Sequence, residues 1–423
     1  MKRLVLFVAL AVAGQAQDVL NKQLPSWVRF SVDERVREES ITGLAFKPSN
    51  DDTYVLQRFR PGITLIAAPW LKFRVQGQDA RVFYKAAKPY APPFQDRWDL
   101  RQAYVELGSI EKGPMLRAGR QEINLGDDRL VGSTNWSNAA RTFDAVRAGY
   151  KWGKYRVDAF ASSVVVLKDG EVGDHTPGNN LHGLDGVLEN VIPKSTLEPY
   201  VLWRISPRVR AELGPVATLS FFTYGFRWVG KLPARFDYGT EVAMQRGSLG
   251  PDKVSAWAGH WLLGYALPGI GLKPRLMAEY NYATGDGNSR DGHRHTFDQL
   301  YPTAHDKYGL ADQVGWKNIH HVRTGVEMKP SPKLAVSGKY GSYWLADAKD
   351  GLYNTSNTLL ARSPNGTAGR YVGQEVDAAG LYTFSKTVTA GAGVGHIFPG
   401  PFLKLTTPGH SLTFQYLFID TRF

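Results

Sequence analysis

The chain of 423 residues contains no cysteine. An exported protein without cysteine has neither a disulfide framework nor a thiolate metal site, so packing or a membrane must stabilise it. Beyond residue 16, no apolar run approaches the roughly 20 residues that a membrane-spanning helix requires, which excludes a helical membrane protein. No Pro/Gly/Ser-rich linker and no fixed-period repeat interrupts the chain. We therefore expect one domain over residues 17–423.

The first sixteen residues resemble a secretory signal peptide. Lys2 and Arg3 precede an apolar run from Leu4 to Val12, and Gly14-Gln15-Ala16 gives a small-x-small ending. Loss of residues 1–16 removes two positive charges and no acids, so the formal net charge falls from +12 to +10. The mature chain is expected to be exported and basic.

The composition favours strands with many turns. The chain contains 44 glycines, 20 tyrosines, 20 phenylalanines and 11 tryptophans. Membrane β-barrels combine turns with aromatic rings at the membrane interfaces, and large β-solenoids share part of this bias. The missing short repeat argues against the solenoid.

Polar and apolar side chains alternate from Arg58 to Gln78, on both sides of the turn Ala67-Ala68-Pro69. A period of two indicates half-buried strands, whose apolar face meets a second sheet in a sandwich or lipid in a barrel. The alternation by itself leaves both folds open. The polar set is Arg58, Arg60, Thr64, Lys72, Arg74, Gln76 and Gln78, and the apolar set is Phe59, Ile63, Leu65, Leu71, Phe73 and Val75.

Similar patterns predict further strands, which with the pair above make seventeen. Short turns such as Trp152-Gly153-Lys154 alternate with long polar segments at 167–195, 284–318 and 346–371, as in outer-membrane barrels. The predicted ranges are 27–37, 99–109, 114–125, 143–151, 155–166, 196–205, 218–229, 234–246, 254–266, 271–283, 319–329, 333–345, 372–385, 387–397 and 411–423.

An even strand number is usual for single-chain bacterial barrels. Arg208–Leu213 alternates at a place where one strand is missing, so we predict eighteen strands. The last residue, Phe423, ends an alternating aromatic strand, as expected of an outer-membrane barrel, although Thr421 stands where an aromatic residue is expected. The predicted fold is an all-β transmembrane antiparallel β-barrel with short periplasmic turns and long extracellular loops.

No hydrolase, metalloprotease, phosphate-loop or dinucleotide fingerprint is present. The close histidine pairs are His293 with His295 and His320 with His321, and neither indicates a catalytic set. The segment from Thr284 to Gly292 resembles a calcium loop but fails the EF-hand pattern at several positions. We expect no cofactor and no metal; the weak alternative is a cation site at Asp286, Asn288 and Asp291.

Basic residues carry the most information about function. Mid-strand arginine on the lipid face costs roughly 2 to 4 kcal/mol, so strand arginines should face the lumen, where rings of Arg and Lys select anions. Nearby acids would hold the guanidinium groups in place or moderate the attraction. A purely structural role as paired charges is the simpler alternative.

Two blocks of sequence resemble the alginate-export outer-membrane porins. The first runs from Leu100 to Leu107 and on through GRQ (119–121), GDDRL (126–130), Trp136, Asn138 and RTFDAVR (141–147). The second is FDQLYPTAHDKYG (297–309) with Asp312, Gly315-Trp316 and Asn318.

The resemblance implies an eighteen-stranded barrel whose arginine-rich lumen conducts a polyuronate without chemistry. It places Arg120, Arg129, Arg141 and Arg147, with Asp127 and Asp144, in the conduit or its support; Asp128 joins the supporting acids. Arg117 and Arg120 are three apart and so face opposite sides of a strand, and only the motif assigns Arg120 to the lumen. Alternation adds Arg58, Arg60, Lys72, Arg74 and Arg81 to the conduit.

We therefore expect an anion-selective channel in the bacterial outer membrane that passively exports an acidic, alginate-like polysaccharide. The alternatives are an uptake porin for small anions or sugar acids and, in another class, a barrel hydrolase that depends on His293, His295 or His320. Expected partners are the anionic polysaccharide, outer-membrane lipid and lipopolysaccharide, and periplasmic export machinery. Nucleic acid is not expected for an exported barrel.

Overall fold

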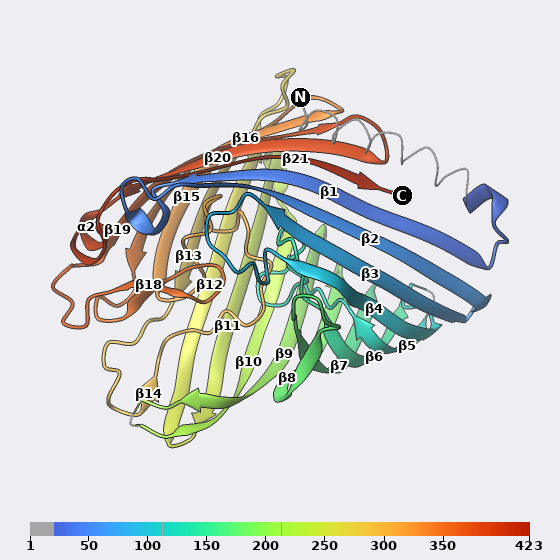
Figure 1. The fold of residues 1–423 in the computed structure, drawn as a ribbon, viewed down its shortest axis with the longest axis horizontal. Helices are drawn as coiled ribbons and strands as arrows, with labels where there is room; N and C mark the ends of the chain where they lie inside the picture. Colours follow the sequence, from blue (N-terminus) through green and yellow to red (C-terminus); the bar gives the residue numbers. More distant parts are fainter. Residues whose placement is uncertain (1–20, 112, 213) are drawn as a thin grey trace.

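The protein is described by a computed structural model that covers residues 21–423 except 112 and 213. The main sheet contains 19 strands, and the two-residue strand β14 (His293–Arg294) only pairs in parallel with β12. The other strands pair antiparallel around a closed barrel, which confirms the prediction of eighteen. Figure 1 shows them following one another from β1 in blue to β21 in red. The predicted signal peptide, residues 1–16, lies outside the described residues.

The barrel strands range from 8 to 17 residues in length. They are β1 (Val28–Thr42), β2 (Asp52–Ala68), β3 (Leu71–Phe83), β4 (Asp96–Gly108), β5 (Pro114–Gln121), β6 (Phe143–Trp152), β7 (Tyr155–Val166), β8 (Asp174–Glu189), β9 (Ser195–Arg210), β10 (Val216–Lys231), β11 (Phe236–Leu249), β12 (Asp252–Ala266), β13 (Arg275–Ala283), β15 (Ile319–Ser331), β16 (Leu334–Leu345), β19 (Tyr371–Thr383), β20 (Val388–Pro399) and β21 (Leu412–Arg422).

The first and last strands close the barrel. β1 and β21 pair from Asp33 opposite Arg422 to Thr42 opposite Thr413. The terminal residue takes part, because the Phe423 N–H donates to the Val32 carbonyl at 2.9 Å. Closure pairs the backbone of both strands and leaves no open sheet edge, which is the condition for a sheet to sit in hydrocarbon.

One strand lies where a loop was predicted. β8 occupies most of the segment 167–195, and it pairs with both β7 and β9. Its first half is polar and contains Pro177 and Gly178, so it shows no alternation. Of the predicted strand Arg208–Leu213, Arg208 to Arg210 are the end of β9, and Leu213 lies outside the described residues. The predicted strand number was therefore right, but the position of the eighteenth strand was wrong.

The alternation in β2 and β3 has the predicted orientation. Arg58 and Arg60 are 0% and 3% exposed, whereas Ile63 and Val75 are 45% and 54% exposed. Polar side chains thus point into the barrel and apolar ones point out of it. The two apolar residues also lie directly opposite each other in register and form part of one outer surface.

Two long loops fill part of the interior. The segments 122–142 and 284–318 contribute Ile123, Leu130, Phe297, Leu300 and Trp316 to a buried apolar cluster. This cluster also includes inward residues of the wall. The two loops contact each other through a parallel bridge between Val131 and Tyr301. Their buried parts therefore form one internal body, which we call the inner plug (residues 122–142 and 297–318).

Helices are few and short in the described chain. The α-helix α2 (Pro401–Thr406) lies between β20 and β21, and the 3-10 helices are η1 (Leu44–Phe46) and η2 (Pro233–Arg235). Within the described residues, no helix is long and apolar enough to cross a bilayer. A small hairpin of β17 (Gly351–Tyr353) and β18 (Leu359–Arg362) stands apart from the main sheet.

A substitution on the outer surface tests whether it contacts lipid. We expect Val75→Arg to lower the free energy of unfolding in bilayers by about 2 to 4 kcal/mol, because the outward position would meet hydrocarbon. Val172 provides a matched control, since it is 58% exposed on the loop between β7 and β8. Val172→Arg should change the value by less than about 0.5 kcal/mol. Equal effects of the two substitutions would contradict a lipid-facing belt.

Candidate functional site

The interior wall carries five of the basic residues predicted from the sequence. Arg58 and Arg60 project from β2, Lys72 and Arg74 from β3, and Arg147 from β6. Arg58 pairs with Asp33 at 2.7 Å, Lys72 with Glu106 at 3.2 Å and Arg147 with Asp158 at 3.0 Å. Most of this charge is thus compensated by acids on neighbouring strands.

Arg74 differs from these pairs. Its guanidinium donates to Thr64 Oγ1 at 3.0 Å and to Ser31 Oγ at 2.9 Å. Both acceptors are neutral hydroxyl oxygens, and no described residue forms an ion pair with Arg74. Its positive charge therefore acts on the interior without a local counter-charge.

On β1, β4 and β5, four further arginines face the interior that were not predicted from the sequence. Arg35 and Arg37 lie on β1, Arg101 on β4 and Arg117 on β5. Arg117 donates through Nε to Glu106 at 2.9 Å and lies over the Tyr104 ring. The alternation of β1, in which Asp33, Arg35 and Arg37 share one face, would have identified two of them.

Two predicted conduit residues lie on the outer face of the wall instead. Arg81 follows Ala80, which is 0% exposed and faces inward, so Arg81 faces outward and pairs with Asp79 at 2.8 Å. Arg120 lies opposite Asp144 and two positions from Ala118, which lies opposite Val146. Val146 is 52% exposed, and Asp144, two positions before it, shares its outward face. Since side chains alternate along a strand, Arg117 and not Arg120 points into the lumen.

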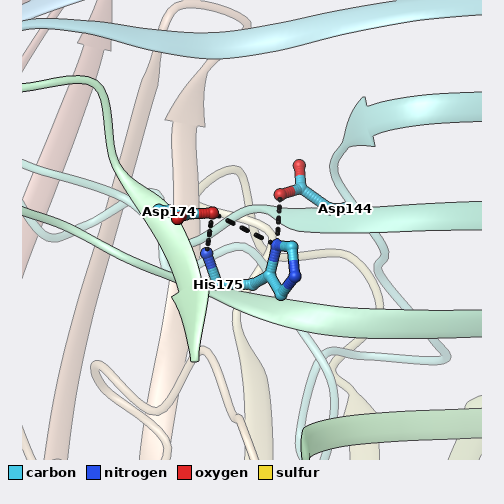
Figure 2. A group of neighbouring side chains, drawn as sticks. All are labelled: Asp144, Asp174 and His175. Atoms are coloured by element: carbon cyan, nitrogen blue, oxygen red, sulfur yellow. Dashed lines mark hydrogen bonds and ion pairs between the residues drawn. The ribbon is translucent and has the colours of Figure 1, made fainter. Parts of the chain in front are cut away.

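Asp144 belongs to a cluster on this outer face. Asp144, Asp174 and His175 place one possible metal-ligand atom each within 4.8 Å of the others, as Figure 2 shows. Arg120 contacts both carboxylate oxygens of Asp144, at 2.8 and 3.0 Å. A bidentate arginine already supplies the positive charge there, and the aspartate and histidine from the start of β8 are exposed. The cluster fastens the start of β8 to β6.

The other predicted arginines lie on the inner plug. Arg129 is 5% exposed; it contacts Asp127 at 3.2 Å, Glu241 at 3.7 Å and the Tyr308 hydroxyl at 3.1 Å. Burial favours the neutral form of Asp127, but Arg129 and Lys307 outweigh it and hold its pKa below the usual range. The buried Arg129 therefore pairs with the half-buried Asp127 within the plug and contacts Glu241, which connects the plug to β11.

Asp128 has a different environment, although it neighbours Asp127. Burial raises its pKa to about 6; Lys307 opposes this rise and the charge of Asp127 adds to it. At neutral pH the side chain is largely ionised, and it becomes neutral in mild acid. No hydrogen bond of the Asp128 side chain to an arginine is present among the described residues, so the predicted bracing of arginines is seen for Asp127 and Asp144 only.

Arg141 ties the two halves of the plug together. Its Nη1 donates to the carbonyl oxygens of Gly132, Tyr301 and Pro302 at 3.1, 2.7 and 3.2 Å. The guanidinium also lies 5.3 Å from the centroid of the Tyr301 ring. Burial lowers its pKa to about 10, so Arg141 remains charged at neutral pH. Its contacts assign it a structural position within the plug.

The second half of the plug is held by acids of the wall. The N–H groups of Ala311 and Leu310 donate to Glu375 at 2.8 Å and to Asp377 at 3.4 Å. Gly309 has a φ of +129°, and a Cβ there would lie 2.2 Å from Glu375 Oε2. Only glycine allows the chain to pass so close to the carboxylate. Asp298 contributes a further bond, to Arg204 of β9 at 2.5 Å.

Two of the cavities lie on opposite sides of the plug, and no residue lines both. The larger, about 1150 Å³, opens among β9 to β12 near the short turns and is lined by Asp127, Arg227 and His260 among others. The smaller, about 410 Å³, lies near the long loops and is lined by Arg37, Trp136 and other residues. The interior is thus accessible from both ends, with the plug between them.

The histidines and the calcium-like loop show no catalytic arrangement. His295 Nδ1 contacts the Ser255 carbonyl at 2.8 Å, and His320 Nδ1 contacts the Tyr280 hydroxyl at 2.7 Å. Asp286 accepts bonds from the backbone N–H groups of Asn288 and His295, and Asp291 accepts one from His293. The bonds from Asn288 and His293 form Asx turns, and the bond from His295 connects the two ends of the loop.

Comparison with known proteins agrees with the barrel. The family model described as alginate export matches residues 26–416. The fold resembles that of OpdK of Pseudomonas aeruginosa, solved with vanillate, with a TM-score of 0.63, 10% identity, and coverage of 93% of this chain and 98% of OpdK.

Two further solved structures share this fold. OccAB2 of Acinetobacter baumannii gives a TM-score of 0.61 at 11% identity, with 95% of this chain and 99% of OccAB2 covered. OprE (OccK8) of Pseudomonas aeruginosa gives a TM-score of 0.61 at 12% identity, with 94% of this chain and 98% of OprE covered. At such identities the similarity shows the fold alone, an outer-membrane porin-type barrel. A search of curated protein sequences found no match.

The buried pairs of the plug should matter for stability. We expect Arg129→Met to lower the free energy of unfolding by about 3 to 5 kcal/mol, because it removes the cation from buried Glu241 and leaves Asp127 with Lys307 alone. Arg97 is a matched control, since its side chain is 50% exposed and pairs with Asp169 at 2.9 Å. Arg97→Met should cost less than about 1 kcal/mol in the same denaturant titration. A similar loss for both variants would show that the buried network does not hold the plug.

Proposed function

Because the chain belongs to the alginate export family, we propose that it is an anion-selective outer-membrane channel that passively exports an acidic, alginate-like polysaccharide. The observation that carries this proposal is the group of arginines on the inner wall of β1 to β5. Arg35, Arg37, Arg58, Arg60, Arg74, Arg101 and Arg117 all project into the lumen there.

Selectivity would come from electrostatics alone. Rings of arginine and lysine in a pore favour anions, and a single charge pair at 4 Å is worth roughly 1 kcal/mol in water and roughly 4 kcal/mol near a protein surface. Wall acids such as Asp33, Glu106 and Asp158 moderate this attraction. A polyanion would then meet several weak sites in series, which lets it enter and also leave.

The same proposal places the protein in the bacterial outer membrane. The outward apolar surface would contact lipid, and charged residues near the loop end, such as Arg81 and Arg97, would contact lipopolysaccharide. The short turns would face the periplasm and any export machinery there. The family and fold indicate a channel and not an enzyme.

Uptake of small acids is the second candidate function. The plug divides the interior into cavities of about 1150 and 410 Å³, which suit small solutes better than a polymer in this conformation. OpdK, which shares the fold, was solved with vanillate, a small carboxylate. Both functions require an anion-selective lumen and differ in the size of the solute.

Reversal potentials in planar bilayers test the selectivity. In a salt gradient the wild type should favour anions. Arg74→Ala should lower the anion-to-cation permeability ratio by about fivefold, since it removes an uncompensated positive charge whose attraction for an anion is worth roughly 1 kcal/mol. Arg81→Ala should leave the ratio unchanged, because Arg81 faces outward. Cation selectivity of the wild type would refute the conduit, and so would equal effects of the two variants.

A second measurement separates the two candidate functions. Proteoliposomes loaded with a long oligouronate should release it about tenfold faster than a neutral maltodextrin of the same length, a difference of about 1.4 kcal/mol in barrier. Vanillate should pass under either function. Retention of the oligouronate together with rapid passage of vanillate would favour the uptake porin and reject polysaccharide export.

A further inference from the structure

Five buried arginines surround one short segment of the inner plug. Residues 135–137 contact or lie beside Arg35 and Arg37 of β1, Arg58 and Arg60 of β2, and Arg101 of β4. Their exposed fractions are 5%, 2%, 0%, 3% and 2%, in that order. So many buried guanidinium groups in one place repel each other and require acceptors.

Three of the five arginines have a carboxylate partner. Arg37 pairs with Glu39 at 2.7 Å, Arg58 with Asp33 at 2.7 Å, and Arg101 with Glu122. Arg35 and Arg60 form no ion pair with any described residue. Two charges of this cluster are therefore buried without a counter-charge in contact.

The neutral acceptors of these two arginines come mainly from the plug. Arg35 donates to the carbonyl oxygens of Asn135, Trp136 and Ser137 at 3.0, 2.7 and 3.2 Å. Arg60 donates to Asn135 Oδ1 at 3.0 Å and to Gln78 Oε1 at 2.8 Å. The segment 135–137 is thus held to the wall by hydrogen bonds from cations to neutral oxygens.

Donors remain even after these bonds. Arg35 Nε, Arg60 Nη2 and Arg101 Nη1 are buried and have no acceptor among the described residues. A carboxylate offers two oxygens with several lone pairs and a full negative charge, and it binds guanidinium groups in a bidentate way. The cluster therefore has both the charge and the free donors that a carboxylate needs.

We propose that this cluster is a carboxylate-binding site, and that a carboxylate bound there takes Arg35 and Arg60 away from residues 135–137 and releases that segment from the wall. This inference rests on the proposed function, since the carboxylate would be that of a passing acidic sugar. A carboxylate adds the attraction between opposite charges and a bidentate geometry, neither of which a neutral carbonyl or amide oxygen provides, so the exchange favours the carboxylate. The substrate would thereby open the path that the plug closes.

The position of the segment suits this role. Trp136 and Ser137 line the cavity on the loop side, whereas Arg35, Arg58 and Arg60 do not. The Trp136 ring is stacked between His305, at 3.7 Å between ring centroids, and the Arg37 guanidinium, at 3.8 Å from its centroid. The segment therefore lies between the cavity and the deeper arginines, and its movement would connect them.

The absence of native cysteine allows a direct test. The Ser137→Cys substitution keeps the backbone carbonyl that accepts from Arg35. The rate at which a water-soluble reagent modifies the Cys thiol then reports release of the segment, because release exposes the thiol to water. Addition of trigalacturonate should raise this rate by at least about fivefold, the factor for one net hydrogen bond of roughly 1 kcal/mol. Neutral maltotriose should have no effect. An unchanged or slower rate with trigalacturonate would overturn the proposal.

Variants separate the site from other effects. Arg60→Gln in the Ser137→Cys protein should abolish the response to trigalacturonate, whereas the outward control Arg81→Gln should keep it. A cysteine at Val172, on an exposed loop, should react at the same rate with or without the sugar. A full response in Arg60→Gln would also reject the site. If the wild type is anion-selective but the cysteine does not respond, the inference fails while the proposed function stands.

Discussion

An arginine removed from water must be given acceptors, and this requirement governs the interior of the barrel. The cost of a buried, uncompensated charge is several kcal/mol even after the protein relaxes, so each inward guanidinium constrains what lies around it. Arg129 contacts Asp127, Glu241 and the Tyr308 hydroxyl. Arg323 pairs with Glu279 at 2.6 Å. These ion pairs and hydrogen bonds fix the plug against the strands that face it.

The backbone carbonyl oxygens of the plug also serve as acceptors for buried arginines. Arg141 uses three carbonyl oxygens to join the two loops, and Arg35 uses three more to attach one of them to the wall. Carbonyl oxygens satisfy the donors but bring no negative charge. A loop fixed in this way is hydrogen-bonded to the wall but does not neutralise the charge of the arginine that holds it.

The sequence predicted what depends on local periodicity and missed what depends on tertiary contacts. The inward position of Arg58, Arg60, Lys72 and Arg74 followed from a period of two. β8 was missed because its polar first half is recognisable only through its pairing with β7 and β9. The motif suggested the lumen for Arg120, but the register with Asp144 places it outside.

The inner plug was beyond sequence reasoning for a related reason. Its buried residues, such as Ile123, Leu130 and Trp316, follow no period, because they fill an irregular space between the wall strands. The partner of Arg129 on β11, Glu241, lies more than a hundred residues away in the chain. Only the closed barrel brings such residues together, so their pairing is a property of the fold and not of any segment.

These contacts divide the interior into two sides with different chemistry. Between β9 and β19, arginines such as Arg204 and Arg323 are matched by carboxylates at 2.5 and 2.6 Å, and an entering anion would have to displace a like charge to reach them. Between β1 and β4 the acceptors are mixed: Arg37, Arg58 and Arg101 have carboxylate partners. Arg35, Arg60 and Arg74 bond to neutral oxygens. An anion that replaces a neutral acceptor gains electrostatic energy, so under the proposed function a passing acid would contact Arg35, Arg60 and Arg74, whereas the arginines paired with carboxylates hold the plug.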